Sequence, residues 1–303
     1  MRRERKGDVM ILVAGATGLV GGMITRSLLA QGQPVRILVR PGSNYQPLVE
    51  AGAQPILGDL KDRASLDAAL VGVEVVITTA NSAQRGGPDN PETVEMQGNR
   101  NLIDAAQAAA VKQFIFVSAL GSDPNSPIPF VRGKGMTEQV LRHSGLAYTI
   151  LAPTAFMDVW AMMIVGMKVM SGLPITLVGE AKRRHSFIGA RDVAAFAVAA
   201  VGHPAALNQY LPLGGPEALS WRDIVAVYER VLGRPLTVQF IAPGEIVPDL
   251  PPVPGLAEFM SGMLASQETF DSVVPMAEMA QAFGVQQTTL ENFVRMQSVP
   301  VSA

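Results

Sequence analysis

The chain has 303 residues, of which 48% are hydrophobic and 17% charged, and it carries a formal net charge of −2. A chain of this length can bury a large core in one large domain or two unequal ones, and its near-neutral charge argues against nucleic acid as a partner. With 0 cysteines and 3 histidines, disulfides, thiolate nucleophiles and a metal site are not expected, and the chain suits the cytoplasm.

The first half of the chain alternates short runs rich in Val and Ile with segments of helical period. Strands that are apolar on both faces and separated by helices indicate a parallel sheet covered on both sides. We therefore expect an α/β fold with a Rossmann-type, doubly wound sheet. The runs predict strands at 9–14, 35–39, 55–57, 73–78, 114–118 and 148–151. The segments between them predict helices at 19–31, 64–70, 93–110 and 133–144.

After about Pro153 this alternation loosens. A methionine-rich helix is predicted first, with short strands near 175–178 and 209–213. The segment 243–254 carries five prolines and predicts an irregular loop, followed by two or three short helices.

The chain thus divides into a Rossmann domain at 1–153 and a smaller α+β region at 154–303, interleaved with the edge of the sheet. The most apolar stretch, about 145–170, is interrupted by a proline and by charged residues. We expect it to be a buried strand and a helix, with no membrane-spanning segment.

A glycine motif follows the first predicted strand. That strand runs into Gly15-Ala-Thr-Gly18-Leu-Val-Gly21, and a helix begins at once. Glycines at this spacing allow a tight turn, close approach of the backbone to a pyrophosphate, and close packing of helix on strand. The helix N-terminus adds unpaired N–H groups and the positive end of its dipole. The motif predicts a dinucleotide site, and the alternative is a simple turn from strand to helix.

Arg40 stands where the second strand ends. Rossmann domains that prefer NAD usually place an acidic residue there, which accepts from the ribose 2′-hydroxyl. An arginine instead suits a 2′-phosphate, with Ser43 and Asn44 available for further hydrogen bonds. We see no Asp or Glu competing for the position. The alternative is a solvated surface arginine.

Further motifs are spread over nearly the whole chain, and together with the opening GATGLVGG they resemble the NmrA-like branch of the atypical short-chain dehydrogenases/reductases, which includes isoflavone-reductase-like members. These motifs are Gly58-Asp59-Leu60, Asn101-Leu-Ile-Asp-Ala-Ala, Val111-Lys-Gln-Phe-Ile-Phe-Val-Ser118, Lys134-Gly-Met-Thr-Glu138, Ser144-Gly-Leu-Ala-Tyr148-Thr-Ile-Leu-Ala-Pro153, Phe187-Ile-Gly-Ala-Arg-Asp192-Val-Ala and Phe283-Gly-Val.

This resemblance implies NADP(H) as the preferred cofactor, with NAD(H) as the alternative. It implies that Arg40 meets the adenosine phosphate and that Asp59 and Leu60 contact adenine, although Asp59 has a second interpretation as a turn aspartate or helix N-cap. The pyrophosphate loop would consist of Gly15, Thr17, Gly18, Leu19 and Val20. The nicotinamide half would lie along Thr79, Ala80 and Asn81, with Pro153 and Phe156 at its border.

Two of the usual catalytic side chains of these reductases are missing. Most short-chain reductases place a Tyr and a Lys four residues apart on one helix, and the lysine lowers the tyrosine pKa for proton transfer. Phe130 occupies the tyrosine position here, and the serine position falls near Ala119 or Leu120.

Lys134 remains as the candidate catalytic residue, either holding the nicotinamide ribose or relaying a proton. The alternative is a solvent-facing lysine paired with Glu138. Asp192 is expected to open and cap a helix.

The leading functional hypothesis is an NADP(H)-dependent reductase that passes hydride to a hydrophobic carbonyl, quinone or other conjugated small molecule. Met157 and the methionines after it suggest an adaptable apolar cleft, with ordinary core packing as the alternative. The runner-up is a non-catalytic NAD(P)H redox sensor or regulatory NmrA-like protein with a protein partner. A third hypothesis is an assembly or scaffold factor. The residues favour no particular oligomeric state.

Overall fold

The computed structural model describes residues 9–82 and 87–298. The chain forms two compact units. The first comprises Met1–Pro153 and Val193–Pro212, and the second comprises Thr154–Asp192 and Leu213–Ala303. The chain leaves the first unit after Pro153 and returns to it for residues 193–212. The boundary at residue 153 is therefore one of several crossings between the units.

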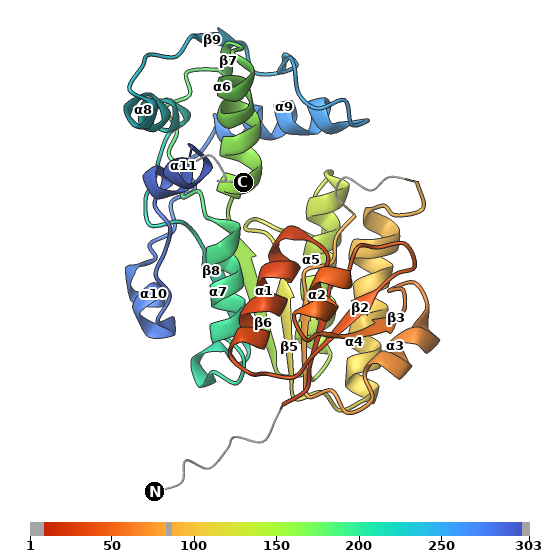
Figure 1. Ribbon diagram of the computed structural model, residues 1–303. Coiled ribbons are helices and arrows are strands. Elements are labelled where there is room, and N and C mark those ends of the chain that lie inside the picture. The colour runs from red at the N-terminus through yellow and green to blue at the C-terminus, as the bar shows by residue number, and fades with distance from the viewer. Residues whose placement is uncertain (1–8, 83–86, 299–303) are drawn as a thin grey trace, which may run out of the picture. The chain divides into compact units, whose positions relative to one another are not determined.

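The first unit is built on a seven-stranded sheet with the order β3-β2-β1-β4-β5-β6-β8, flanked by helices (Figure 1). Neighbouring strands from β3 through β6 pair in parallel. This arrangement confirms the predicted Rossmann-type α/β fold. The strands are β1 Ile11–Ala14, β2 Val35–Val39, β3 Gln54–Leu57, β4 Val75–Thr78, β5 Gln113–Val117, β6 Tyr148–Pro153 and β8 Gln209–Leu213.

Strand β8 lies beside β6 in this sheet, whereas the sequence placed it in the C-terminal region. Asn208, at φ +58°, turns the chain into the strand, and its backbone N–H donates to the carbonyl oxygen of Tyr148 at 2.6 Å. Local patterns predict that a segment is a strand but do not indicate its pairing partner. The sequence therefore predicted the strand but not its pairing with β6.

The helices of the first unit begin and end close to the predicted bounds, with two differences. The segment predicted as one helix at 93–110 is a π-helix followed by an α-helix, and Pro129 starts a helix that was predicted to begin at Gly133. The short α2 was not predicted. The helices are α1 Leu19–Ala30, α2 Gln46–Glu50, α3 Arg63–Ala69, η1 Pro91–Gly98 (π), α4 Asn99–Ala108, α5 Pro129–His143, α7 Ala190–Ala199 and η3 Pro204–Ala206 (3₁₀).

The second unit pairs two parallel strands, β7 and β9, and packs helices around its own core. Strand β9 was not predicted. Met157 and Met260 are buried in this core and the partly buried Met163 packs against it, as the alternative of ordinary core packing predicts. The elements are η2 Met157–Gly166 (π), α6 Met167–Ser171, β7 Ile175–Val178, α8 Trp221–Leu232, β9 Val238–Ile241, α9 Leu256–Gln267, α10 Ala277–Phe283 and α11 Leu290–Ser298.

Asp192 lies in the first turn of α7, as expected, but it does not cap the helix. Its carboxylate accepts from the backbone N–H and the hydroxyl of Thr288, both at 2.8 Å. The backbone N–H of Ala190, the first residue of α7, donates instead to Asp158 at 2.7 Å. Asp192 therefore anchors the C-terminal segment. Over residues 9–82 and 87–298, no helix combines the length and the apolar character needed to cross a membrane.

A close contact between α1 and two strand ends fixes the first unit. A Cβ on Gly21 would lie 2.2 Å from the carbonyl oxygen of Gly15 and 2.8 Å from the Thr79 hydroxyl. A Cβ on Gly15, which has φ +84°, would lie 2.7 Å from the same hydroxyl. Helix and strands approach to a distance that only glycine permits.

Gly21→Ala is expected to lower the free energy of unfolding by on the order of 3 kcal/mol, because the added methyl meets backbone that cannot rotate away. The matched control is Gly262→Ala. Gly262 also lies inside a helix, α9, but a Cβ there would find open space, so alanine should raise the free energy of unfolding by about 0.4–1 kcal/mol. Urea unfolding followed by circular dichroism measures both, and equal midpoints for the two variants would contradict the steric argument.

Candidate functional site

The glycine motif forms a loop that presents the N-terminus of α1. The Gly18 N–H donates to the carbonyl oxygen of Gly15 at 3.0 Å, and Gly18 then accepts from Gly22 at 2.9 Å, so the loop closes directly into the helix. Gly18 has no side chain with which to cap α1, and the first turn, Leu19 to Gly22, is uncharged. The positive end of the helix dipole and its N–H groups are thus left for an anion.

A hollow of about 360 Å³ adjoins this loop. Leu19 is 48% exposed beside it and leaves an apolar surface next to the polar loop. Of the predicted loop residues, Thr17, Gly18 and Leu19 line the hollow. The full lining is Ala16, Thr17, Gly18, Leu19, Gly22, Met23, Arg26, Asn44, Pro47 and Leu48.

Arg40 does not stand alone at the end of β2. Its guanidinium pairs with Asp89, which is 49 residues away in sequence, and lies 4.0 Å from a carboxylate oxygen of Asp59. The Lys61 ammonium pairs with the other oxygen of Asp89 and lies 3.5 Å from Asp59. The expectation that no acid competes for Arg40 is therefore wrong, and so is the alternative of a simple solvated arginine.

Asp59 is a turn aspartate and not a helix cap. Its Oδ1 accepts from the backbone N–H of Lys61 at 2.9 Å, while the N-cap of α3 is Asp62, which accepts from Ala64 at 3.1 Å. The side chain of Leu60 is buried in the core, and its carbonyl oxygen accepts from Asn101 at 2.9 Å. This turn holds the Asp59 carboxylate at the carboxyl end of β3, next to Arg40.

The carboxyl end of β4 is joined to the glycine loop. The Thr79 hydroxyl donates to the carbonyl oxygen of Gly15 at 3.3 Å, and the Asn81 side chain donates to the Thr79 carbonyl oxygen at 3.2 Å. Thr79 and Ala80 are each 9% exposed. The residues predicted for the nicotinamide half thus continue the edge that carries the predicted pyrophosphate loop.

Lys134 is buried, so the alternative of a solvent-facing lysine is wrong. Its Nζ donates to the carbonyl oxygen of Val117 at 2.9 Å and lies 4.8 Å and 5.7 Å from the ring centroids of Phe116 and Phe130. Burial lowers the pKa of the ammonium to about 8, against the opposing charges of Glu95 and Glu138. Phe130, in the position of the usual tyrosine, covers the lysine with an aromatic face and offers no proton.

Glu138 is engaged elsewhere. It accepts from the Ser118 hydroxyl at 2.5 Å and lies 3.8 Å from Arg142, and burial raises its pKa. Ser118 in turn contacts the Ser122 hydroxyl at 3.3 Å. Ser118, which follows β5, is therefore hydrogen-bonded to helix α5 through Glu138.

Glu95 is a buried acid near Lys134 that the sequence analysis missed. One carboxylate oxygen accepts from the Ser82 backbone N–H at 2.8 Å, and the other finds no hydrogen-bond partner among the residues that the structure describes. The Thr137 hydroxyl donates to its backbone carbonyl at 2.5 Å, and a Cβ on Gly133 would lie 2.7 Å from its side chain. The π-helical turn of η1 brings Glu95 inward, and the helical period of the sequence gives no signal of it.

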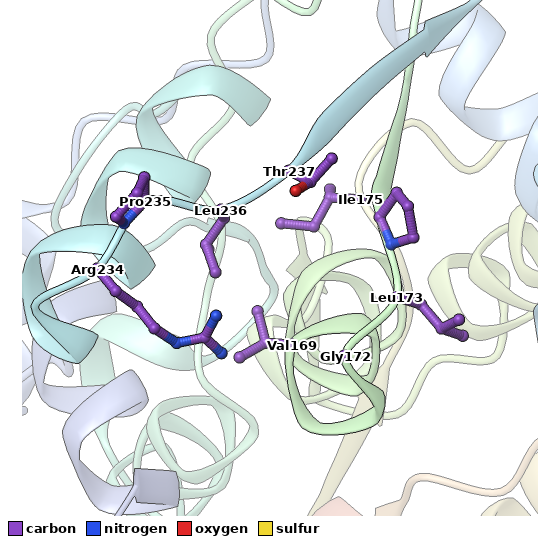
Figure 2. Close-up of a pocket in the computed structure, with 9 residues that line it drawn as sticks. Val169, Gly172, Leu173, Ile175, Arg234, Pro235, Leu236 and Thr237 are labelled. Carbon is purple, nitrogen blue, oxygen red and sulfur yellow. The ribbon is translucent and has the colours of Figure 1, made fainter.

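Pro153 and Phe156 belong to different units. Pro153 ends β6, where its carbonyl oxygen accepts from Leu120 at 2.8 Å. Phe156 is the N-cap residue before η2 in the second unit and forms a bridge with Ile188. A small cavity of about 110 Å³ in the second unit, shown in Figure 2, includes none of the predicted site residues. It is lined by Val169, Gly172, Leu173, Pro174, Ile175, Arg234, Pro235, Leu236 and Thr237.

Known proteins similar to this chain include curated enzymes and an assembly factor. This chain is 36% identical over 233 residues to the NAD(P)H azoreductase of Xenophilus azovorans, and the match covers 77% of each chain. It is 35% identical over 229 residues to the photosystem II assembly factor Ycf39 of Cyanophora paradoxa, covering 74% of this chain and 69% of that protein.

Among solved structures, the fold is similar to an NADPH-dependent quinone oxidoreductase of Escherichia coli in complex with NADPH. The TM-score is 0.79 at 24% identity, with 95% of this chain and 99% of the other covered. The model of the NmrA-like family matches residues 7–296. By the motifs, the sheet order and this match, the chain belongs to the NmrA-like family.

Proposed function

We propose that this protein is an NADP(H)-dependent reductase that passes hydride to a hydrophobic carbonyl, quinone or other conjugated small molecule. The observation that carries the proposal is the glycine loop, which leaves the N-terminus of α1 uncapped for a pyrophosphate. The similarity to a protein named NAD(P)H azoreductase supports it. A chain without cysteine suits the reducing cytoplasm, which we propose as its compartment.

We assign the dinucleotide to the carboxyl edge of the sheet, where the first unit gathers a glycine loop, cations and a buried lysine. Arg40 would bind the 2′-phosphate, and Asp59 and Leu60 would contact adenine. The pyrophosphate would meet Gly15, Thr17, Gly18, Leu19 and Val20, and the nicotinamide half would lie along Thr79, Ala80, Asn81, Lys134, Pro153 and Phe156.

Lys134 would provide the proton chemistry. The bound nicotinamide supplies the hydride, while the protein orients the reactants and excludes water. Lys134 is held at the carboxyl end of β5 by the Val117 carbonyl oxygen, and its pKa of about 8 allows it to lose and regain a proton near neutral pH. The rings of Phe116 and Phe130 lie 4.8 Å and 5.7 Å from the ammonium and form part of its surroundings.

A second candidate is a non-catalytic role, as a redox sensor or an assembly factor. Two observations favour it: Phe130 replaces the usual proton donor, and a relative of 35% identity is named as an assembly factor. If the purified protein binds NADPH but oxidises it with no acceptor from a panel of quinones, azo dyes and aryl ketones, this second candidate replaces the first.

Gly18→Val should abolish dinucleotide binding while the fold is kept. Gly18 has an extended backbone, φ −84° and ψ 171°, which valine adopts, and an added Cβ would have the Gly15 carbonyl oxygen as its nearest neighbour, at 3.3 Å. The branched side chain would stand where the backbone must approach the pyrophosphate. Isothermal titration calorimetry with NADPH, beside circular dichroism of the variant, tests this. Unchanged affinity in a folded variant would show that the loop is only a turn.

NADPH should bind more tightly than NADH, because the Arg40 guanidinium at the end of β2 would bind the 2′-phosphate that only NADPH carries. Arg40→Ala should therefore reduce the difference between the two affinities. The control is Arg63→Ala, which removes one positive charge from an exposed pair with Asp67 in the same unit. Titration of both cofactors decides the matter. An Arg40→Ala variant that keeps the full preference of the unmodified protein for NADPH would remove Arg40 from the site.

Lys134→Ala should lower turnover by a factor on the order of 10² or more, the usual scale for a positioned acid–base group. Lys134→Arg should not restore it, because guanidinium keeps its proton and has a different shape. If Lys134 donates the proton as an ammonium, kcat/KM should fall as pH rises through about 8, where the ammonium deprotonates.

Cofactor affinity measured in parallel separates the two roles of Lys134. A relay role lowers turnover with affinity nearly unchanged, whereas a ribose contact lowers both. A Lys134→Ala protein with normal kinetics would contradict both roles.

A further inference from the structure

Four charged groups meet at the carboxyl ends of β2 and β3. Arg40 comes from the end of β2, Asp59 and Lys61 from the turn after β3, and Asp89 from the segment before η1. Asp89 is the centre of this group, because each of its carboxylate oxygens pairs with a different cation, one with Arg40 and one with Lys61. Asp59 lies at the periphery, 4.0 Å from Arg40 and 3.5 Å from Lys61.

The arrangement around Asp89 has the features of an anion site. A carboxylate resembles a phosphate in that its negative charge is shared among oxygens. The guanidinium and the ammonium that hold this carboxylate could therefore hold a phosphate in the same way. The Asp89 side chain is only 9% exposed, whereas those of Arg40 and Lys61 are 37% and 33% exposed. The two cations can thus be reached by a ligand, and the anion that they now bind is part of the chain.

Among the residues that the structure describes, the group holds two cations and two carboxylates. A 2′-phosphate carries close to two negative charges at neutral pH. If it joined the group with every ion pair kept, these charges would lie beside the carboxylates of Asp59 and Asp89. Unit charges a few ångströms apart near a protein surface interact by several kcal/mol, so such a crowded arrangement is strongly disfavoured.

Protonation does not relieve the conflict. Burial raises the pKa of the Asp89 carboxyl, but the hydrogen bonds and charges of Lys61 and Arg40 outweigh burial and hold the pKa at about 2. The pKa of Lys61 is raised, chiefly by its hydrogen bond to Asp89. Asp89 and Lys61 therefore stay charged near neutral pH, and a competing anion is what can release the cations.

We propose that Asp89 is an internal competitor for the 2′-phosphate of the cofactor, taking up Arg40 and Lys61 in the free protein and giving them up when the phosphate binds. This inference rests on the proposed NADP(H) site. It makes Lys61 a second phosphate ligand beside Arg40. It makes Asp89 the residue that sets how strongly the protein prefers NADPH to NADH, because only the phosphorylated cofactor competes with the carboxylate.

The sign of one substitution tests the proposal. Asp89→Asn keeps the shape of the side chain and removes its charge, so NADPH and 2′,5′-ADP should bind on the order of 10-fold more tightly, while NADH and 5′-ADP change less than twofold. Lys61→Gln should weaken binding of NADPH and 2′,5′-ADP on the order of 10-fold and leave NADH unchanged. Calorimetric titration with these four ligands at fixed ionic strength gives the dissociation constants.

The matched control is Asp67→Asn. Asp67 is an exposed carboxylate on α3 that pairs with Arg63 at 2.8 Å, so its removal changes the net charge of the chain by the same amount without touching the group. It should leave all four affinities within twofold. An equal gain in NADPH affinity from Asp67→Asn and Asp89→Asn would overturn the proposal, since the effect would then come from overall charge.

The remaining outcomes separate this inference from the proposed function. Weaker NADPH binding by Asp89→Asn, with NADH unaffected, would mean that Asp89 orients Arg40, which overturns the inference and keeps the NADP(H) site. No change in any affinity would also overturn it. If neither dinucleotide binds the unmodified protein or Asp89→Asn, both proposals are wrong. A gain of NADPH binding seen only in Asp89→Asn would support the inference even where the unmodified protein binds weakly.

Discussion

The packing of Gly21 against the carbonyl oxygen of Gly15 is the constraint on which the first unit depends. At 2.2 Å from that oxygen there is no room for a Cβ, so α1 lies against the end of β1 at a distance that other residues forbid. The Thr79 hydroxyl approaches the same point from β4 and donates to Gly15. One contact therefore fixes the helix, two central strands and the loop between them. The loop can present the N-terminus of α1 to an anion because its backbone has this fixed support.

The first unit has two cationic regions, one at Lys134 and one at Arg40 and Lys61, and their positive charges are stabilised in different ways. Lys134 contacts a carbonyl oxygen and lies near two aromatic rings. The effect of burial on its pKa outweighs that of the nearby carboxylates, so the pKa is lowered toward neutrality. Arg40 and Lys61 are more exposed and share a carboxylate that neutralises them. The first environment favours exchange of a proton and the second favours exchange of one anion for another. The family resemblance alone does not distinguish these environments, because they depend on Glu95 and Asp89, which come from other segments.

The sequence predicted the fold well because its signals are local. Buried parallel strands are apolar on both faces, and the glycine motif requires a strand before it and a helix after it, so β1 to β6 and α1 were found near their true bounds. Strand β9 and helix α2 were missed, since four or five residues carry little periodicity. The site residues proposed from the sequence all lie in or next to motifs or the ends of predicted strands, whereas Asp89 and Glu95 lie outside them. Asp89 acts on a residue 49 positions away, and Glu95 is turned inward by a π-helical segment, and neither relation leaves a pattern in the local sequence.

The return of the chain to its first sheet has a consequence for synthesis and folding. Strand β6 is paired with β5 on one side and β8 on the other, and β8 is made only after residues 154–192 have been added to the chain. Until about residue 213 has left the ribosome, β6 is an edge strand with unpaired backbone groups and mostly buried side chains, the kind of edge that recruits other chains. The sheet closes late, and the intervening segment must be accommodated as a loop while it does so. A nascent chain paused between β6 and β8 therefore presents an unpaired strand edge that the complete sheet covers.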